Sequence, residues 1–128
     1  MILVDTSAWI DFFRGRDPIA RLVDEALEAN EAALCGPVHA ELRRGLANAK
    51  ERTRVLSLLS GCHQLSQPDN LWADAGALGF ALRRRGFTTK TLHLLIATYA
   101  IHHGASLLTS DRDFADMKKA GISLRLER

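Results

Sequence analysis

The sequence predicts an α/β fold in which helices lie on both sides of a small, mostly parallel central sheet. Short apolar segments alternate along the chain with longer segments whose apolar residues recur at helical spacing, and this alternation is typical of parallel α/β folds. The predicted helices outnumber the predicted strands, so we expect a small sheet. No linker, repeat or low-complexity stretch interrupts the sequence, and we expect residues 1–128 to form a single domain with its own core.

Each predicted strand is a short apolar run that ends at a turn or capping residue. The first run stops at Asp5, and the run before Asp111 ends in the same way. The predicted strands are residues 1–4, 32–35, 106–109 and 122–126.

Each predicted helix has apolar residues three or four positions apart, and several begin or end at a recognisable signal. Asp17 and Pro18 start one helix as its N-cap and first residue, Thr91 caps another, and Gly104 ends that second helix. Thr6 or Ser7 can cap the first helix. The predicted helices are residues 8–13, 18–30, 37–47, 51–60, 71–82 and 92–103, with one helical turn over 113–117.

The composition is ordinary for a soluble globular protein, with 47% hydrophobic residues, 25% charged residues and a formal net charge of +2. No apolar run approaches the ~18 residues of a membrane span, and the N-terminus lacks the basic and then apolar layout of a signal peptide. We therefore expect a cytoplasmic protein without a membrane segment. Cys35 and Cys62 form neither a CxxC motif nor a zinc-binding spacing, so we expect two reduced, buried thiols.

Acidic residues follow two predicted strands, Asp5 directly and Asp111 after Ser110. If these strands are parallel, both carboxylates project into the crevice at the carboxyl edge of the sheet, where ligands bind in such folds. Glu41 lies on the helix after strand 32–35 and can reach the same place. We expect nothing in the neighbourhood of Asp5 to pair it, and three carboxylates this close repel one another unless a cation lies between them. Oxygen ligands of this kind suit Mg²⁺ or Mn²⁺, which can activate water for phosphodiester hydrolysis.

Each of these acids also has a purely structural interpretation. Asp5 can cap the helix that follows it, and Glu41 can be a first-turn acid favoured by the helix dipole. Asp111 can be a turn residue after its strand, and Asp113 can cap the turn that carries Phe114.

A family resemblance is carried by four segments: MILVDTSAWIDFF, GPVHAELRRG, TKTLHLLIATYAI and LLTSDRDF. Together they span the chain in order and closely resemble the PIN-domain proteins, specifically the toxin nucleases of VapBC-type toxin–antitoxin pairs. The resemblance implies a three-layer α/β/α fold and an endoribonuclease that depends on a divalent metal, Mg²⁺ or Mn²⁺. It also implies a homodimer and a cognate VapB-type antitoxin, whose C-terminal segment occupies the active-site groove.

The resemblance also implies roles for individual residues. Three residues match acidic positions that bind metal in the family: Asp5, Glu41 and Asp111. Asp113 matches a further acidic position that supports the site, and Thr109 matches a hydroxyl residue that holds the last strand end in place. Five positions are supporting residues in this interpretation: Thr6, Ser7, His93, Thr109 and Asp113.

His93 departs from the family pattern, because such toxins place an aspartate at this point of the helix. The change reduces four carboxylates to three, which lowers the expected affinity for Mg²⁺. An imidazole suits Mn²⁺ and later transition metals better than Mg²⁺. The departure therefore predicts weakened catalysis, a shift in metal preference, or both.

Arginines are the candidate RNA-binding residues, because clustered guanidinium groups neutralise phosphates. The candidates are Arg83, Arg84, Arg85 and Arg112. A solvated helix end explains the Arg83–Arg85 cluster equally well, since cations complement the dipole at a helix C-terminus.

Two other functions remain open at the level of sequence. With His93 in place of an acid, the domain could bind RNA or its antitoxin without cutting. A metal-dependent phosphatase or DNA nuclease would use the same carboxylates with a differently shaped groove. Host growth with the chain expressed alone, with and without His93→Asp, separates the first alternative from a nuclease.

Overall fold

The computed structural model describes residues 1–127, which form a four-stranded parallel sheet and seven helices. The central strand β1 pairs with β2 on one side and β4 on the other, and the order across the sheet is β3-β2-β1-β4. The strands are β1 (Ile2–Val4), β2 (Ala32–Leu34), β3 (His63–Gln64) and β4 (Ser106–Leu108). The predicted small parallel sheet is therefore confirmed.

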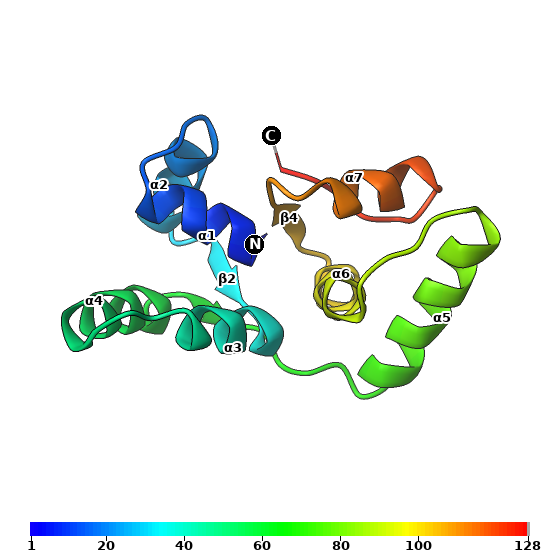
Figure 1. Cartoon of the computed structure of the whole chain (residues 1–128), viewed down its shortest axis with the longest axis horizontal. Helices are drawn as coiled ribbons and strands as arrows, with labels where there is room; N and C mark the ends of the chain where they lie inside the picture. The colour runs from blue at the N-terminus through cyan, green and yellow to red at the C-terminus, as the bar shows by residue number, and fades with distance from the viewer. Residues whose placement is uncertain (128) are drawn as a thin grey trace.

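Helices cover both faces of this sheet, which confirms the predicted layering (Figure 1). They are α1 (Thr6–Phe13), α2 (Ile19–Glu28), α3 (Gly36–Arg44), α4 (Ala49–Ser60), α5 (Leu71–Arg84), α6 (Thr91–His103) and α7 (Arg112–Lys119). On one side α1 packs against α2, and α2 contacts β2; on the other, α6 contacts β4 and separates it from α5 (Figure 1). No helix within residues 1–127 is long and apolar enough to cross a membrane.

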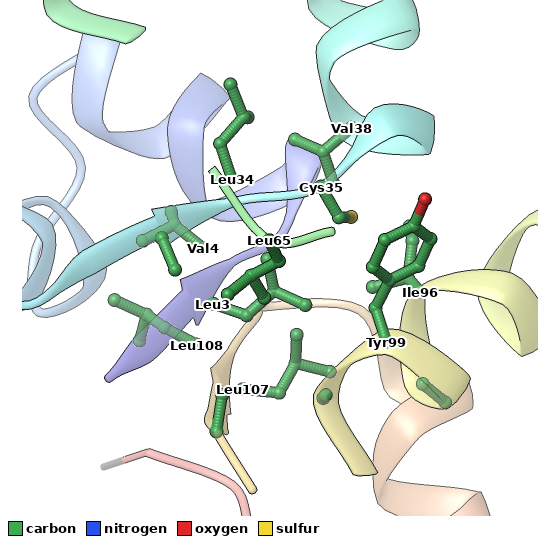
Figure 2. Packing of buried hydrophobic residues seen from close by; sticks show 14 of the residues in the cluster. Leu3, Val4, Leu34, Cys35, Val38, Leu65, Ile96, Tyr99, Leu107 and Leu108 are labelled. Carbon is green, nitrogen blue, oxygen red and sulfur yellow. The ribbon is translucent and has the colours of Figure 1, made fainter. Parts of the chain in front are cut away.

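The core lies between the sheet and these helices. Leu3 and Val4 of β1 and Leu107 and Leu108 of β4 are completely buried, and they join Ile96 of α6 in one apolar cluster (Figure 2). Burial of each such side chain stabilises the fold by about 1.5–3 kcal/mol. This packing sets the register of β1 against β4, and so the edge of the sheet at which both strands end.

Two strand predictions are wrong. Residues 122–126 do not form a strand, because the Leu124 N–H turns back to the carbonyl oxygen of Ile122, and only Leu126 forms a bridge to Leu107. The strand β3 was not predicted, because both of its residues are exposed and polar and leave no apolar run. Its pairing with β2 depends on backbone hydrogen bonds that carry no side-chain pattern.

Several helix ends also differ from the prediction. Thr91 is the first residue of α6 rather than its cap, and Lys90 takes the N-cap position without a side-chain cap. Thr6 and Ser7 lie inside α1 because Asp5 is the N-cap residue. The predicted single turn near Phe114 is an eight-residue helix, α7.

Candidate metal centre at the strand ends

The site is built where β1 and β4 end side by side. The two strands are parallel and in register over three residue pairs, so the segments that follow them emerge at the same edge of the sheet. The Asp5 N–H donates to the carbonyl oxygen of Leu108 at 2.9 Å, which extends the pairing one residue past β1. The predicted meeting of the two strand ends is confirmed.

Asp5 is held by hydroxyl groups and is almost completely buried, with 2% exposure. Its Oδ2 accepts hydrogen bonds from Ser7 Oγ at 2.7 Å and Thr109 Oγ1 at 2.8 Å. The expectation that nothing nearby pairs Asp5 is therefore wrong, because the neutral hydroxyls of α1 and the β4 end do so without a cation. The side chain makes no capping hydrogen bond to α1, which removes the structural alternative for Asp5.

The two hydroxyls also hold the segment after β4. Thr109 Oγ1 accepts from the Asp111 N–H at 3.0 Å, and Ser7 Oγ accepts from the Ser110 N–H at 3.1 Å. Each hydroxyl thus donates to Asp5 and accepts from the backbone leading to α7. The network fixes Asp5 and Asp111 relative to each other.

Glu41 reaches the site from α3, which begins directly after β2 and Cys35. Its Oε1 accepts a short hydrogen bond, 2.6 Å, from Thr6 Oγ1. This bond ties α3 to α1 beside Asp5. Glu41 lies in the second turn of α3 rather than the first, so dipole stabilisation at the helix N-terminus does not account for its position.

His93 contacts two carboxylates of the last predicted motif. Its Nδ1 lies 2.7 Å from Asp113 Oδ2, and its Nε2 lies 3.6 Å from Asp111 Oδ2. Asp111 is also the N-cap of α7, where its Oδ1 accepts from the Asp113 N–H at 2.9 Å. The predicted cap at Asp113 is therefore wrong, because Asp111 caps this helix.

The carboxylates share one feature that suits a metal ion. Within residues 1–127, each uses one oxygen in the hydrogen bonds described above: Asp5 uses Oδ2, Glu41 uses Oε1, and Asp111 uses Oδ1 in its cap. The second oxygen of each receives no hydrogen bond from the described residues. One group in this part of the chain already brings its ligand atoms within 4.8 Å of one another, and it consists of His93, Asp111 and Asp113. Carboxylate oxygens with an imidazole nitrogen are a donor set that divalent cations accept.

Three of the four candidate RNA-binding arginines, Arg83–Arg85, lie at the C-terminal end of α5. Arg85 donates to the carbonyl oxygen of Ala120 at the end of α7, and Arg84 lies over the ring of Phe80, with 5.8 Å from its guanidinium carbon to the ring centroid. Both side chains are at the C-terminal end of α5, in accord with the solvated-helix-end interpretation. Arg112 is the first residue of α7 and is exposed beside Asp111.

Sequence reasoning missed Cys35 as a neighbour of the acids. Burial, with smaller contributions from the nearby charges of Asp5 and Glu41, raises the pKa of this thiol to about 12. Cys35 follows β2 as Asp5 follows β1, so the parallel strand order could have indicated its place. The thiol belongs to the apolar core, where Tyr99 of α6 lies close to it (Figure 2).

Two hollows open beside the centre. One, of about 320 Å³, lies between α1, α3 and α4, and its polar lining residues are Thr6, Arg14, Glu41 and Glu51. Its other lining residues include Ile10, Phe13, Leu42 and Val55. The second, of about 460 Å³, is lined by residues 109–112 and by Arg21 and Leu22 of α2.

Comparison with known proteins identifies the class of domain. The PIN domain family matches residues 2–120. VapC ribonuclease Mb1587 of Mycobacterium bovis is 36% identical, with 89% of each chain covered, and ribonuclease VapC32 of Mycobacterium tuberculosis is 44% identical over 99% of this chain and 98% of its own length.

Solved structures agree on the fold. DNA-bound VapBC from Salmonella typhimurium has a chain that superimposes with a TM-score of 0.79 at 18% identity, covering 98% of this chain and 96% of that one. A chain of VapBC2 from Rickettsia felis, bound to a promoter DNA fragment, superimposes with a TM-score of 0.77 at 22% identity, covering 99% and 98%. A three-layer α/β domain with acids gathered at parallel strand ends is thus the class to which this protein belongs. The chain is a member of the PIN domain family, and its curated relatives are VapC ribonucleases.

Proposed function

We propose that this chain is the toxin of a type II toxin–antitoxin system, and that it hydrolyses RNA phosphodiester bonds as a divalent-metal-dependent endoribonuclease. The 36% and 44% identical VapC ribonucleases, matched over almost their whole length, support the activity. The observation that carries the proposal is the arrangement at the strand ends, where Asp5, Glu41 and Asp111 each keep one oxygen without a hydrogen bond from the described residues.

In the proposed mechanism, Asp5, Glu41 and Asp111 hold Mg²⁺ or Mn²⁺. A bound ion of this kind supplies an activated water and neutralises charge on the phosphoryl group. Ser7 and Thr109 orient the Asp5 carboxylate, and Thr6 orients Glu41, so these hydroxyls keep the ligand oxygens in position before the substrate arrives.

RNA binding is proposed for the exposed arginines. Arg112 is the best placed, because it lines the second hollow together with Asp111 and Arg21. Arg83 belongs to the same exposed cluster at the C-terminal end of α5 as Arg84 and Arg85. A phosphate contact by Arg112 predicts weaker RNA binding after Arg112→Ala and a smaller dependence of binding on salt.

A cognate VapB-type antitoxin is the proposed protein partner. The apolar lining residues of the hollow between α1, α3 and α4 can receive apolar side chains of an antitoxin segment, and Glu41, which also lines it, can accept an arginine. We also propose a homodimer that forms a hetero-oligomer with the antitoxin, in the cytoplasm where RNA is available. Co-purification with the product of an adjacent small gene, followed by mass determination in solution, tests both assemblies.

The first experiment is RNA cleavage by the purified chain with Mg²⁺ or Mn²⁺. Asp5→Asn is expected to abolish cleavage, whereas Asp24→Asn, a matched change of an exposed acid on α2, leaves it intact. The substrate panel includes single-stranded DNA and p-nitrophenyl phosphate, so that a DNA nuclease or phosphatase is recognised by its preferred substrate. Cleavage that survives Asp5→Asn would contradict the proposed site.

A second candidate function rests on His93. Because an imidazole stands at a position where the family pattern has an acid, the chain could instead be an antitoxin-binding or RNA-binding module with impaired catalysis. RNA binding without cleavage in either metal, together with cleavage after His93→Asp, would support this alternative.

A further inference from the structure

The imidazole of His93 lies between two carboxylates in a partly enclosed position. Its side chain is 12% exposed, compared with 34% for Asp111 and 29% for Asp113. Phe114 of α7 packs against the imidazole with a ring-centroid distance of 5.0 Å. The ring is therefore held in one orientation, with its two nitrogens directed at different acids.

The two nitrogens have different partners. A carboxylate oxygen can only accept, so at 2.7 Å from Asp113 Oδ2 the His93 Nδ1 must carry the hydrogen. In the neutral ring this leaves Nε2 with a free lone pair, and Nε2 faces Asp111 Oδ2 at 3.6 Å, beyond hydrogen-bond distance. Two acceptor atoms that face each other at this separation have room for a cation between them.

The separation is compatible with two ligands of one ion. Metal–ligand bonds of about 2.0–2.2 Å place two adjacent ligand atoms about 2.9–3.4 Å apart, depending on the coordination geometry. The 3.6 Å between Nε2 and Oδ2 is slightly longer than this range, so a shift of a few tenths of an ångström brings both atoms within reach of one ion.

We propose that His93 Nε2 and Asp111 Oδ2 are ligands of one first-row transition ion, in the range Mn²⁺ to Zn²⁺, and that Asp113 positions the imidazole through Nδ1. The proposal rests on the metal centre of the proposed function and specifies its ion and a nitrogen ligand. The chain Asp113–His93–ion is the carboxylate–histidine–metal arrangement that sets the tautomer and increases the basicity of the ligand nitrogen. A site with a nitrogen ligand selects transition ions over Mg²⁺.

Mn²⁺ is the probe, and pulsed electron paramagnetic resonance is the measurement. A directly bound imidazole nitrogen modulates the electron spin echo of Mn²⁺, so the wild-type protein is expected to give a nitrogen coupling without any mutation. His93→Gln is expected to remove the coupling and to weaken Mn²⁺ binding, measured by calorimetry, at least tenfold. The matched control is His102→Gln, an exposed histidine at the far end of α6, which should change neither.

Asp113→Asn tests the positioning role. An amide oxygen can still accept from Nδ1 but lacks the negative charge, so the nitrogen coupling is retained and Mn²⁺ affinity falls about tenfold, as is usual for such outer partners. Affinity unchanged by Asp113→Asn would overturn the positioning role.

Mn²⁺ bound without nitrogen coupling in the wild-type protein, or Mg²⁺ bound as tightly as Mn²⁺, would overturn the proposal. So would an absence of Mn²⁺ binding. RNA cleavage is measured separately: nitrogen-coordinated Mn²⁺ without cleavage refutes the proposed function alone. Cleavage with oxygen-coordinated Mn²⁺ refutes this inference alone.

Discussion

Thr109→Val removes the hydroxyl that joins the end of β4 to Asp5 while preserving the shape of the side chain. Thr109 Oγ1 donates to Asp5 Oδ2 at 2.8 Å and accepts from the Asp111 N–H at 3.0 Å. Loss of a hydrogen bond to a charged group costs about 1.5–3 kcal/mol, and an unpaired N–H costs at least about 1 kcal/mol when buried. Asp5 keeps its bond from Ser7, and Asp111 is partly exposed, so we expect a loss of about 2–3 kcal/mol of unfolding free energy.

Urea unfolding followed by circular dichroism measures this loss. The control is Thr53→Val, because the Thr53 hydroxyl donates only to the Ala49 carbonyl on the exposed face of α4, and we expect a change below about 0.5 kcal/mol there. Ser7→Ala and the double variant Ser7→Ala/Thr109→Val complete a double-mutant cycle. In this cycle a coupling free energy of about 0.5–3 kcal/mol indicates that the two hydroxyls belong to one network. A loss below about 0.5 kcal/mol for Thr109→Val would refute the reasoning that these hydroxyls hold the site together.

Three further predictions concern the acids, the imidazole and the thiols. Asp111→Asn preserves the side-chain cap of α7, whereas Asp111→Ala removes it. In urea unfolding we therefore expect only the Ala variant to lose free energy of unfolding, by about 1 kcal/mol, while both variants lose RNA cleavage. His93→Asp is expected to raise Mg²⁺-supported RNA cleavage and host toxicity about tenfold, which corresponds to only about 1.4 kcal/mol of transition-state stabilisation. Equal cleavage rates for the variant and the wild-type protein across Mg²⁺ and Mn²⁺ titrations would contradict this prediction. Burial raises the pKa of Cys35 to about 12 and of Cys62 to about 11, from 9.0. The unfolded chain therefore loses these protons first, and unfolding free energy should fall as pH rises above 9, with a smaller slope in Cys35→Ala; a flat profile would exclude the effect.

Much of the fold follows from local patterns in the sequence. Apolar runs such as residues 1–4 are interrupted by Asp5, and this pattern predicts both a buried strand and the acid that follows it. The parallel arrangement then follows from the alternation of strands and helices, because a helix must cross over between parallel neighbours. The polar strand β3 carries no such pattern and was not predicted, whereas segment 122–126 carries an apolar pattern but forms only a single bridge, at Leu126.

The list of candidate site residues also came from the sequence, partly through the resemblance of four segments to the PIN family. Residue type and order along the chain indicated that Asp5, Glu41 and Asp111 belong together. Neither residue type nor order predicts which oxygen atom of each carboxylate accepts a hydrogen bond within the fold. That depends on hydroxyls such as Thr109, which reaches Asp5 across 104 positions of the sequence.

Only the tertiary structure decided which partner each polar side chain contacts and which of its atoms remain available to a ligand. It pairs His93 with Asp113 through one nitrogen, leaves the other nitrogen facing Asp111, and makes Asp111 both a helix cap and a candidate ligand. The physical reason is that hydrogen bonds are directional and extend only about 3 Å. Their partners are set by the packing of α6 against α7, a relation between distant segments that no local pattern of residues records.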